Sequence, residues 1–482
     1  MQSLQIIDSN KVFLVNRSEI RERLDPSIYR PHFKFISNKY KNVKLSEIAW
    51  VNPFCSFEKN DVVSFVPMDA IDSVNGIVAY KGVKKVDETK GFTRFKEGDI
   101  LWAKITPCMQ NGKSAIANNL LNGYGCGSTE FFVIRSKDEN VVLQEYLLFL
   151  LRDERILKTA MNYFGGSAGQ QRVSTLFLKT FNVPLPGIEK QKSYCKLLKN
   201  AQIIKQQKEQ QAEDILNSID DYLLGELGIK LPEMDLQKIQ DRVFIVSFGE
   251  ICNGRFDPKL YSIPVKQLKQ SLYLSPFDKQ PLKYYIKNNC SGEWGKNDSE
   301  EVDENKYTKC LVIRATEFDN TYNLRLDNSR VKYRWIENSK LSRMDIQPND
   351  LLIEKSGGSE DQPVGRISIL TDEILKGDQI AYSNFIHKIT VEGINPMYLY
   401  FYLRTMYNIK ITDSMQSQTN GIRNLIMQEY FDQIIVAPPL QKQQEIVNHI
   451  MAMRQQAKSL QEEGKEILEQ AKQKVESMIM CK

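Results

Sequence analysis

The stretch Asp99-Ile100-Leu101-Trp102-Ala103-Lys104 decides the fold, because the chain repeats it about 250 residues later as Asp350-Leu351-Leu352-Ile353-Glu354-Lys355. Four further blocks recur in the same order. They pair 13–29 with 244–261, 145–152 with 397–404, 169–172 with 420–423, and 186–191 with 438–443. One match could be coincidence, but five in order indicate a tandem duplication, with the first block at an offset about twenty residues shorter than the others.

Each copy opens with a mixed segment of short apolar or alternating runs, bounded by Gly, Asn and Pro. These runs predict strands, and two longer apolar stretches predict a helix packed on each sheet. Each copy is therefore expected to be an α+β globule. The predicted strands are 99–103, 131–134, 351–353 and 385–389, and the predicted helices are 145–163 and 396–407.

A long polar helix follows each globule, and its apolar residues recur at the 4-3 spacing of a coiled coil. The second seam runs from Ile446 to Met478 and is broken only by Lys474; the first shares its register but carries Lys205 and Lys208 in the middle. These lysines either weaken the coil or are met by acids such as Glu462 and Glu463. The predicted seam residues are Leu198, Ala201, Ile215, Ile219, Ile446, Ile450, Met453, Leu460 and Ile467.

The two helices are expected to pair with each other as an antiparallel coiled coil related by a pseudo-two-fold axis. The first helix would span about 58 Å at 1.5 Å per residue. The predicted boundaries are a first globule over 1–187, a helix over 188–228, a linker over 229–240, a second globule over 241–438 and a helix over 439–482.

The composition indicates a soluble, cytoplasmic, multi-domain protein. The 482 residues include 65 Lys and Arg against 60 Asp and Glu, and the resulting charge of +5 is too small to indicate a nucleic-acid partner by itself. The eight cysteines stand singly and there are three histidines, which argues against a disulfide framework and a metal site. No apolar run approaches the length of a membrane helix, and the first twenty residues lack the pattern of a signal peptide.

Motifs of catalysis are weak or missing. Gly165-Gly166-Ser167-Ala168-Gly169 fits the G-x-S-x-G elbow of hydrolases, but a helix is expected before it and the second copy lacks it, so a flexible connector is the better interpretation. There is no phosphate-binding G-x-x-x-x-G-K-[ST] loop. Asn52-Pro53-Phe54 and Asn395-Pro396-Met397-Tyr398 lack the second proline of the amino-methyltransferase tetrapeptide. The chain is therefore expected to be a reader or scaffold without catalytic residues.

Three features favour DNA. Arg330–Trp335 alternates basic and apolar residues, so a strand there would put its cations on one face and Val331, Tyr333 and Trp335 in the core; an ordinary amphipathic strand explains it equally well. In each copy a lysine and a polar, Gly-containing loop follow the predicted strand, over 104–113 in the first copy and 355–366 in the second. Such loops let backbone amides and short side chains approach phosphates or base edges.

The third feature is a pair of glutamine-rich segments, each of which ends in an arginine. Glutamine pairs well with adenine and arginine with guanine, but a packing salt bridge is an equally good explanation of Arg172 and Arg423. The candidate DNA-binding residues are Lys104, Thr106, Gln110, Asn111, Lys113, Ser167, Gln170, Gln171, Arg172, Arg330, Lys332, Arg334, Lys355, Ser356, Gly357, Arg366, Gln418, Asn420 and Arg423.

Over essentially its whole length the chain resembles the specificity subunits of type I restriction-modification systems. The residues that carry the resemblance are Gly98–Leu101, Asn349–Leu352, the loop Lys355–Ser359, and the helix starts Pro186–Gln191 and Pro438–Gln443. In that family each globule is a target-recognition domain for one half of a split DNA sequence. The coiled coil sets the spacing and docks two methyltransferase (modification) subunits. A helix of the predicted length is compatible with half-sites one to two DNA turns apart.

The resemblance implies a chain without an active site that binds double-stranded DNA and no membrane. Its partners would be the two methyltransferase subunits and a restriction/motor subunit. S-adenosylmethionine and ATP are expected on those partners, and no cofactor on this chain. Two alternatives stay open: a specificity subunit of a related system whose methyltransferase and nuclease are fused in one partner, and a non-catalytic coiled-coil scaffold that binds protein.

Overall fold

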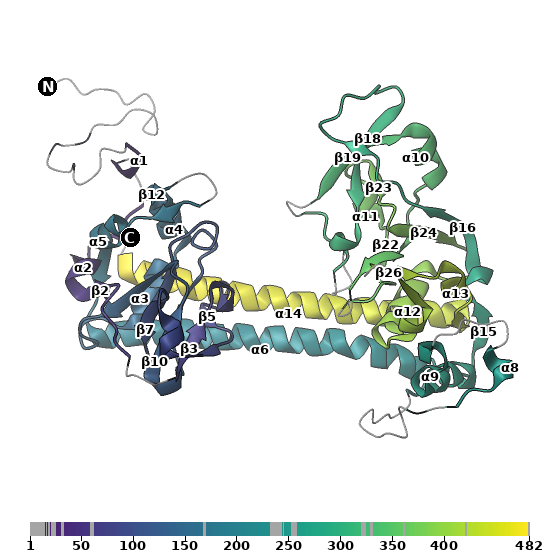
Figure 1. Ribbon diagram of the computed structural model, residues 1–482, viewed down its shortest axis with the longest axis horizontal. Helices are drawn as coiled ribbons and strands as arrows, with labels where there is room; N and C mark the ends of the chain where they lie inside the picture. Colours follow the sequence, from purple (N-terminus) through teal and green to yellow (C-terminus); the bar gives the residue numbers. More distant parts are fainter. Residues whose placement is uncertain are drawn as a thin grey trace. The chain divides into compact units, whose positions relative to one another are not determined.

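The computed structural model describes residues 15, 17, 20, 26–29, 33–57, 62–166, 170–231, 243, 245–251, 258–319, 324–327, 331–359, 362–419 and 422–480. The chain divides into two compact units: residues 1–209 with 461–482 form unit 1, and residues 210–460 form unit 2. Each unit therefore contains one globule, here called globule 1 or globule 2, together with adjoining parts of both long helices (Figure 1).

Two four-stranded sheets build globule 1, in the orders β2-β11-β8-β9 and β6-β3-β10-β7. Strand β8 is buried throughout and pairs antiparallel with β11. The strands are β2 (Ala49–Val51), β11 (Phe131–Ser136), β8 (Ile100–Ala103), β9 (Ser114–Ile116), β6 (Gly82–Lys85), β3 (Val62–Val66), β10 (Tyr124–Gly127) and β7 (Thr93–Lys96). Three further pairs are β1 (Lys41–Lys44) with β14 (Asn182–Leu185), β4 (Ile71–Asp72) with β5 (Ile77–Val78), and β12 (Phe164–Gly165) with β13 (Arg172–Val173).

Short helices complete globule 1. The predicted helix over 145–163 is wrong in one respect, because it is two helices, α3 (Gln144–Leu151) and α4 (Glu154–Met161). The chain breaks there because the Asp153 side chain accepts the N–H of Arg155 and starts a new helix. The remaining helices are α1 (Pro26–Tyr29), α2 (Leu45–Ile48) and α5 (Thr175–Thr180).

Globule 2 repeats the two four-stranded sheets, in the orders β16-β24-β20-β22 and β17-β19-β18-β23, and adds a sheet β21-β26-β25. The strands are β16 (Ile286–Ser291), β24 (Ile386–Val391), β20 (Leu351–Glu354), β22 (Ile367–Ile369), β17 (Lys296–Asn297), β19 (Lys332–Glu337), β18 (Tyr307–Ile313), β23 (Ile380–Tyr382), β21 (Ser356–Gly358), β26 (Ile422–Leu425) and β25 (Gln416–Thr419), with β15 (Asp278–Pro281) paired to β27 (Ile434–Ala437). The helices are α8 (Phe248–Ile251), α9 (Ile263–Leu274), α10 (Asn338–Met344), α11 (Asp372–Leu375), α12 (Pro396–Asn408) and α13 (Met427–Phe431). The four predicted strands and the predicted helix over 396–407 are present within a few residues.

A buried aspartate closes the turn before the central strand of each globule. The Asp99 carboxylate accepts the N–H of Lys96 at 2.8 Å, and the Asp350 carboxylate accepts the N–H of Gln347 at 2.8 Å. Both aspartates are 0% exposed. Since the same bond recurs in both copies, the repeated Asp-Ile/Leu-Leu block encodes this turn.

The two copies neutralise the buried aspartate from different positions on the neighbouring strand. Arg135 on β11 donates to both oxygens of Asp99, at 2.6 and 2.7 Å. On β24 the ion pair is made by Lys388, at 2.9 Å from Asp350, while Thr390 donates a hydrogen bond at 2.6 Å. The strand registers make Thr390 the equivalent of Arg135, so the cation has moved by two residues along one strand face.

A buried glutamine fastens each long helix to its globule. The side-chain oxygen of Gln191 accepts the N–H of Leu143 at 3.0 Å, just before α3, and that of Gln443 accepts the N–H of Asn395 at 2.8 Å, just before α12. Each glutamine amide also donates to the carbonyl of the proline five positions earlier, at 2.8 and 2.7 Å. The repeated Pro-x-x-x-Lys-Gln block is therefore the joint between globule and helix.

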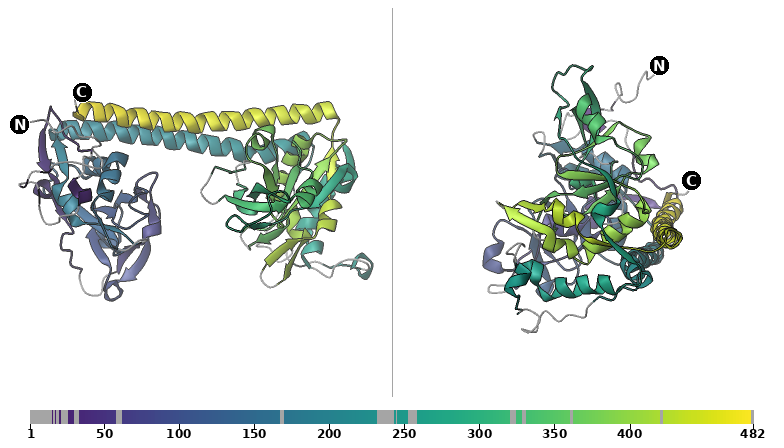
Figure 2. Two further views of the ribbon diagram at one scale, coloured as in Figure 1. Left: turned by 90° about the horizontal axis from the view of Figure 1, so that it is seen from above. Right: turned by 90° about the vertical axis from the view of Figure 1, so that its right-hand side faces the viewer.

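The two long helices, α6 (Ile188–Glu226) and α14 (Leu440–Met480), run antiparallel within each unit, as predicted. In unit 1 Lys208 of α6 pairs with Glu463 of α14 at 2.6 Å, and in unit 2 the ring of Tyr222 stacks on that of His449 with centroids 4.2 Å apart. Figures 1 and 2 show the helices side by side in both units. Among the described residues, none of the helices is long and apolar enough to cross a membrane.

The seam of the two helices accommodates the lysine at its centre. Lys205 is 4% exposed, lies against Gly464 of the other helix, and ion-pairs with Glu209 of its own helix at 2.8 Å. The seam does not break at Lys474, because the next residue, Val475, is fully buried in its place. Of the predicted seam residues, Ala201, Ile219, Ile446 and Ile450 are buried, while Leu198, Ile215, Met453, Leu460 and Ile467 are half-buried.

The shifted cation predicts a rescue in globule 2. Lys388→Val leaves the Asp350 carboxylate buried without its cation and is expected to lower the free energy of unfolding by about 3–5 kcal/mol. Adding Thr390→Arg reproduces the arrangement of globule 1 and is expected to recover at least half of that loss. Urea denaturation of the full chain measures both, with Lys332→Ala as an exposed-lysine control that changes stability by about 0.5 kcal/mol or less. Equal stability of the single and double variants would refute the equivalence.

Candidate nucleic-acid interface

Two predicted DNA-binding segments of globule 1 lie together at the end of β8. The carbonyl of Lys104 accepts the N–H of Val173 at 2.9 Å, and the N–H of Thr106 donates to the carbonyl of Gln171 at 3.0 Å. Ile105 and Arg172 form an antiparallel bridge between these bonds. We call this meeting of residues 104–113 with 170–173 junction 1.

The same contact recurs in globule 2. The carbonyl of Lys355 accepts the N–H of Leu425 at 2.8 Å, and β21 then pairs with β26. The side chains of Ser356 and Asn424 are hydrogen-bonded at 2.5 Å. We call this meeting of residues 355–359 with 422–425 junction 2. Segments more than sixty residues apart in sequence thus meet at one place in each globule.

Glycine is required in the chain at junction 2. Gly357 has φ of +105°, where residues with a side chain are strained, and a Cβ on Gly358 would come within 2.8 Å of the carbonyl of Gln362. Gly357 is therefore needed for its φ, and Gly358 for the close approach of residues 362–364.

Each junction begins with a lysine whose ammonium contacts a side chain of a neighbouring strand, β11 in globule 1 and β16 in globule 2. In globule 1 the Lys104 ammonium lies 5.5 Å from the centre of the Phe132 ring. In globule 2 the Lys355 ammonium donates to the hydroxyl of Ser291 at 2.9 Å, and that hydroxyl is hydrogen-bonded to Nδ1 of His387 at 3.1 Å. His387 occupies the place of Phe132 in the strand register, so the lysine is kept while its support has changed.

His387 is neutral in this arrangement. Its Nε2 is hydrogen-bonded to Oδ1 of Asn289 at 2.9 Å, and burial, together with the nearby charge of Lys355, lowers its pKa to about 4. Burial also lowers the pKa of Lys355. A neutral imidazole next to the Ser291 hydroxyl therefore holds the lysine without adding a second positive charge.

The sequence aligned Arg172 with Arg423, but that alignment is wrong by one residue, because Ile105 pairs with Arg172 whereas Ser356 pairs with Asn424. Arg172 donates to both carboxylate oxygens of Glu130, with contacts of 2.9 and 2.8 Å, and to the carbonyl of Gln170 at 3.1 Å. The salt-bridge interpretation therefore describes Arg172. The guanidinium of Arg423, on β26, forms no ion pair or hydrogen bond with another described residue.

The other candidates in junction 1 are partly occupied. The Lys113 ammonium donates to the carbonyl of Met68 at 3.0 Å, and the Gln110 amide lies 3.9 Å from the sulfur of Met161. Gln110, Asn111 and Gln170 are exposed, while the side chains of Thr106 and Gln171 are half-buried. Ser167, Arg330 and Asn420 lie outside the described residues, as does the side chain of Gln418.

The predicted basic strand exists as β19, but its expected facing is wrong. Tyr333 is 38% exposed and donates to Asp378 at 2.7 Å, whereas Ile336 is fully buried. Arg334 is not free, because its guanidinium donates to the carbonyl of Trp294 at 2.9 Å and lies 4.2 Å from the Trp294 ring centre. Of the described cations on this strand, Lys332 remains exposed.

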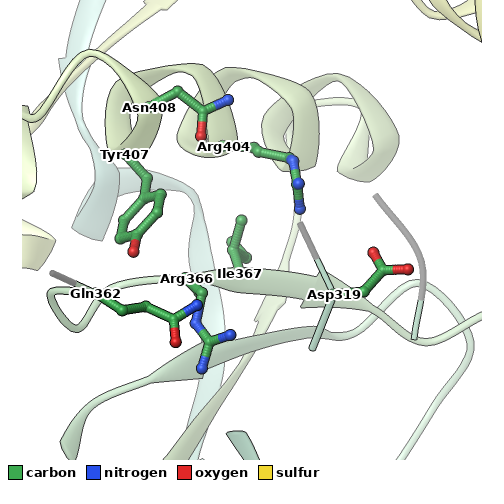
Figure 3. Close-up of a pocket in the computed structure, with 7 residues that line it drawn as sticks. All are labelled: Asp319, Gln362, Arg366, Ile367, Arg404, Tyr407 and Asn408. Carbon is green, nitrogen blue, oxygen red and sulfur yellow. The ribbon is translucent and has the colours of Figure 1, made fainter. Parts of the chain in front are cut away.

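Arg366 is also held inside the fold. It donates to both oxygens of the buried Glu354, at 2.8 and 2.9 Å. Burial raises the pKa of Glu354, and the hydrogen bond from Arg366 opposes that effect. Arg366 lines a cavity of about 460 Å³ under α12, into which Tyr407 and Arg404 project (Figure 3). Its position in the Gly-containing loop over 355–366 predicted a contact with DNA. Its guanidinium instead binds Glu354 on β20, the strand before that loop.

Sequence reasoning missed Glu130, Phe385 and Ser291. Glu130 and Phe385 directly precede β11 and β24, and aligning the two copies at these strands would have paired them. Ser291 carries no sequence signal, since its role depends on β16 lying beside β24. Among the described residues, no group of three or more His, Cys, Asp or Glu side chains is placed to hold a metal ion.

Comparison with known families decides the identity. The model of the type I restriction modification DNA specificity domain matches the chain twice, over residues 37–214 and 293–470, which is well over half of its length. The chain belongs to this family. The predicted resemblance is therefore confirmed, as is the fold of two repeated α+β globules with two long helices. The match identifies a specificity component, not the catalyst of such a system.

Individual relatives agree with the family match. The EcoAI specificity subunit of Escherichia coli is 33% identical over 192 residues, 39% of this chain and 32% of that protein. The EcoEI specificity subunit of Escherichia coli is 38% identical over 146 residues, 30% of this chain and 24% of that protein. These alignments span about a third and a quarter of the two relatives.

A solved structure shares the fold. A chain from a study of complex assembly and conformational transition of the type I restriction-modification system superposes with a TM-score of 0.51. It is 15% identical, and the superposition covers 91% of this specificity-domain chain and 96% of that chain.

The buried histidine predicts a pH-dependent stability. Its pKa is 6.5 in an unfolded chain and about 4 in the fold, so its contribution is complete above pH 6.5 and is lost as the pH falls toward 4. The loss amounts to about 3 kcal/mol. The difference in unfolding free energy between the native protein and His387→Gln should shrink by that amount from pH 7 to pH 4, measured by urea denaturation at each pH. A difference that does not change with pH would contradict the assignment.

Proposed function

We propose that this chain is the sequence-specific DNA-recognition subunit of a type I restriction-modification complex, in which each globule reads one half of a bipartite target. The observation that carries the proposal is the tandem match to the DNA specificity family, over 37–214 and 293–470. Each match contains one junction and the start of the helix that follows it. Two copies with the same frame and different junction residues support two separate half-sites.

In this proposal the junctions face the DNA duplex. Exposed cations such as Lys332 contact phosphates and position the globule, while amide and guanidinium side chains read base edges. Gln110, Gln170 and Arg423 have the donor and acceptor groups that base readout needs.

The coiled coil is proposed to set the spacing between half-sites and to dock two methyltransferase (modification) subunits. Exposed apolar side chains on its outer faces, including Ile203 at 42% and Met451 at 43%, support a protein partner there. S-adenosylmethionine is proposed to be bound by the methyltransferase subunits and ATP by a restriction/motor subunit. This chain then contributes no cofactor and no catalytic group, and acts on cytoplasmic DNA.

Deletion of the gene tests the proposal directly. Methylated adenines are mapped across the host DNA with the gene present, deleted, and restored. A split motif with a fixed spacer should disappear on deletion and return on restoration. An unchanged methylation map after deletion, in a strain that expresses the complex, would contradict the proposal.

Exchange of one globule tests the independence of the readers. Replacing residues 1–186 with the corresponding half of a relative should change one half of the motif and leave the other half intact. Sequencing of the methylated sites checks this, and the reciprocal exchange of the second globule is the matched control. A change in both halves would show that the globules do not read separately.

A further inference from the structure

The two lysines that open the junctions differ from three other cations withdrawn from water in the globules. Arg135, Lys388 and Arg366 each face a carboxylate, at 2.6, 2.9 and 2.8 Å. Lys104 and Lys355 are half-buried as well, but neither forms an ion pair with another described residue. A half-buried ammonium loses part of its hydration, and here no described acid replaces it. Both lysines can therefore accept an anion from outside the chain.

Both lysines occupy the same place in the frame. The N–H of Lys104 donates to the carbonyl of Glu130, and the N–H of Lys355 donates to the carbonyl of Phe385, each at 2.9 Å. Glu130 and Phe385 directly precede β11 and β24. The backbone thus fixes both lysines in one register, although the loops that follow differ in sequence. A lysine present in both copies without an internal counter-charge indicates a role that the two globules share.

A hydrogen-bonded network holds the ammonium of globule 2. Lys355 donates to the hydroxyl of Ser291 at 2.9 Å, and that hydroxyl is hydrogen-bonded to Nδ1 of His387 at 3.1 Å. Nε2 of the ring donates to Oδ1 of Asn289, so Nδ1 is the acceptor and the serine oxygen faces the ammonium. One N–H of the ammonium is used in this way, and the other two have no acceptor in the described part of the chain.

An aromatic ring takes the place of this network in globule 1. The Lys104 ammonium lies 5.5 Å from the centre of the Phe132 ring, and Phe132 matches His387 in the strand register. A ring face attracts the ammonium without using an N–H. Each globule thus orients the same cation with different side chains.

We infer that the ammonium groups of Lys104 and Lys355 each bind a phosphate of the DNA duplex. Phe132 in globule 1, and Ser291 with His387 in globule 2, are their positioning residues. The inference rests on the proposed function. Two readers of different half-sites differ in the residues that contact bases, but the phosphates are the same in every sequence, so a lysine common to both readers matches them. A phosphate also supplies the charge and the acceptors that each ammonium lacks inside the chain.

The salt dependence of DNA binding tests the phosphate contacts. The complex of the full chain with its methyltransferase partners is titrated with a duplex that carries the methylated motif, from about 50 to about 200 mM salt. Lys355→Gln keeps a donor for Ser291 but removes the charge, and should reduce the slope of log K against log salt by about 1. Lys104→Gln should do the same, and both together should reduce it by about 2. Methylation mapping should give an unchanged motif.

Lys287→Ala is the matched control. Lys287 lies on β16, as Ser291 does, but its side chain is 64% exposed and its ammonium is 3.7 Å from Glu392. Its replacement should leave the salt slope unchanged.

A double-mutant cycle tests the positioning role. Ser291→Ala should weaken binding by about 3- to 10-fold in the native chain. It should have no further effect in the Lys355→Gln chain, because the serine acts through the ammonium. Ser291→Ala combined with His387→Phe supplies the aromatic support of globule 1 and should recover most of the loss.

An unchanged slope for either lysine variant, an equal decrease for Lys287→Ala, or an altered motif overturns the inference. Loss of the methyltransferase from either lysine variant overturns it too, because the lysine would then hold a protein partner. Equal losses for Ser291→Ala with and without Lys355 would show that the serine is structural. If the native complex binds the motif duplex no better than an unrelated duplex, it is the proposed function that fails.

Discussion

A carboxylate fully withdrawn from water stands before the central strand of each globule, and the positions of junctions 1 and 2 depend on it. A buried charge is tolerated only when hydrogen bonds and a cation surround it, so the turn of Asp99 or Asp350 and the neighbouring strand must keep one register. With that register held, the strand ends at Lys104 or Lys355, opposite the segment that carries the repeated arginine. A small polar core thus determines which residues can meet a ligand.

Much of this frame can be predicted from the sequence because the duplication supplies a comparison within one chain. Two of the recurring blocks hold a side chain that bonds to the backbone in both copies, the aspartate before the central strand and the glutamine at the helix joint. The coiled coil is likewise predictable, because its period is local and its two lysines are compatible with it. Lys205 fits since the opposite residue is Gly464.

The candidate site was only partly predictable, for a physical reason. A cation in a polar loop looks alike in sequence whether it faces solvent or a buried acid. Arg366 and Arg334 are held by Glu354 and by the Trp294 carbonyl, whose proximity depends on tertiary packing. The prediction of which face of β19 is buried was wrong for a similar reason. The residue that enters the core is Ile336, which lies just beyond the stretch 330–335 on which the prediction was based. Local pattern located the junction segments but not the state of their side chains.

The shift of the neutralising cation between Arg135 and Lys388 limits how the two copies can exchange genetic material. A crossover inside β11 or β24, between the two positions that carry the cation, would give an aspartate with two cations or with none. Viable recombination breakpoints therefore avoid the span Val133–Arg135 and the matching span Lys388–Thr390. Each span is inherited as one unit, so exchange between the copies keeps one cation beside each buried aspartate.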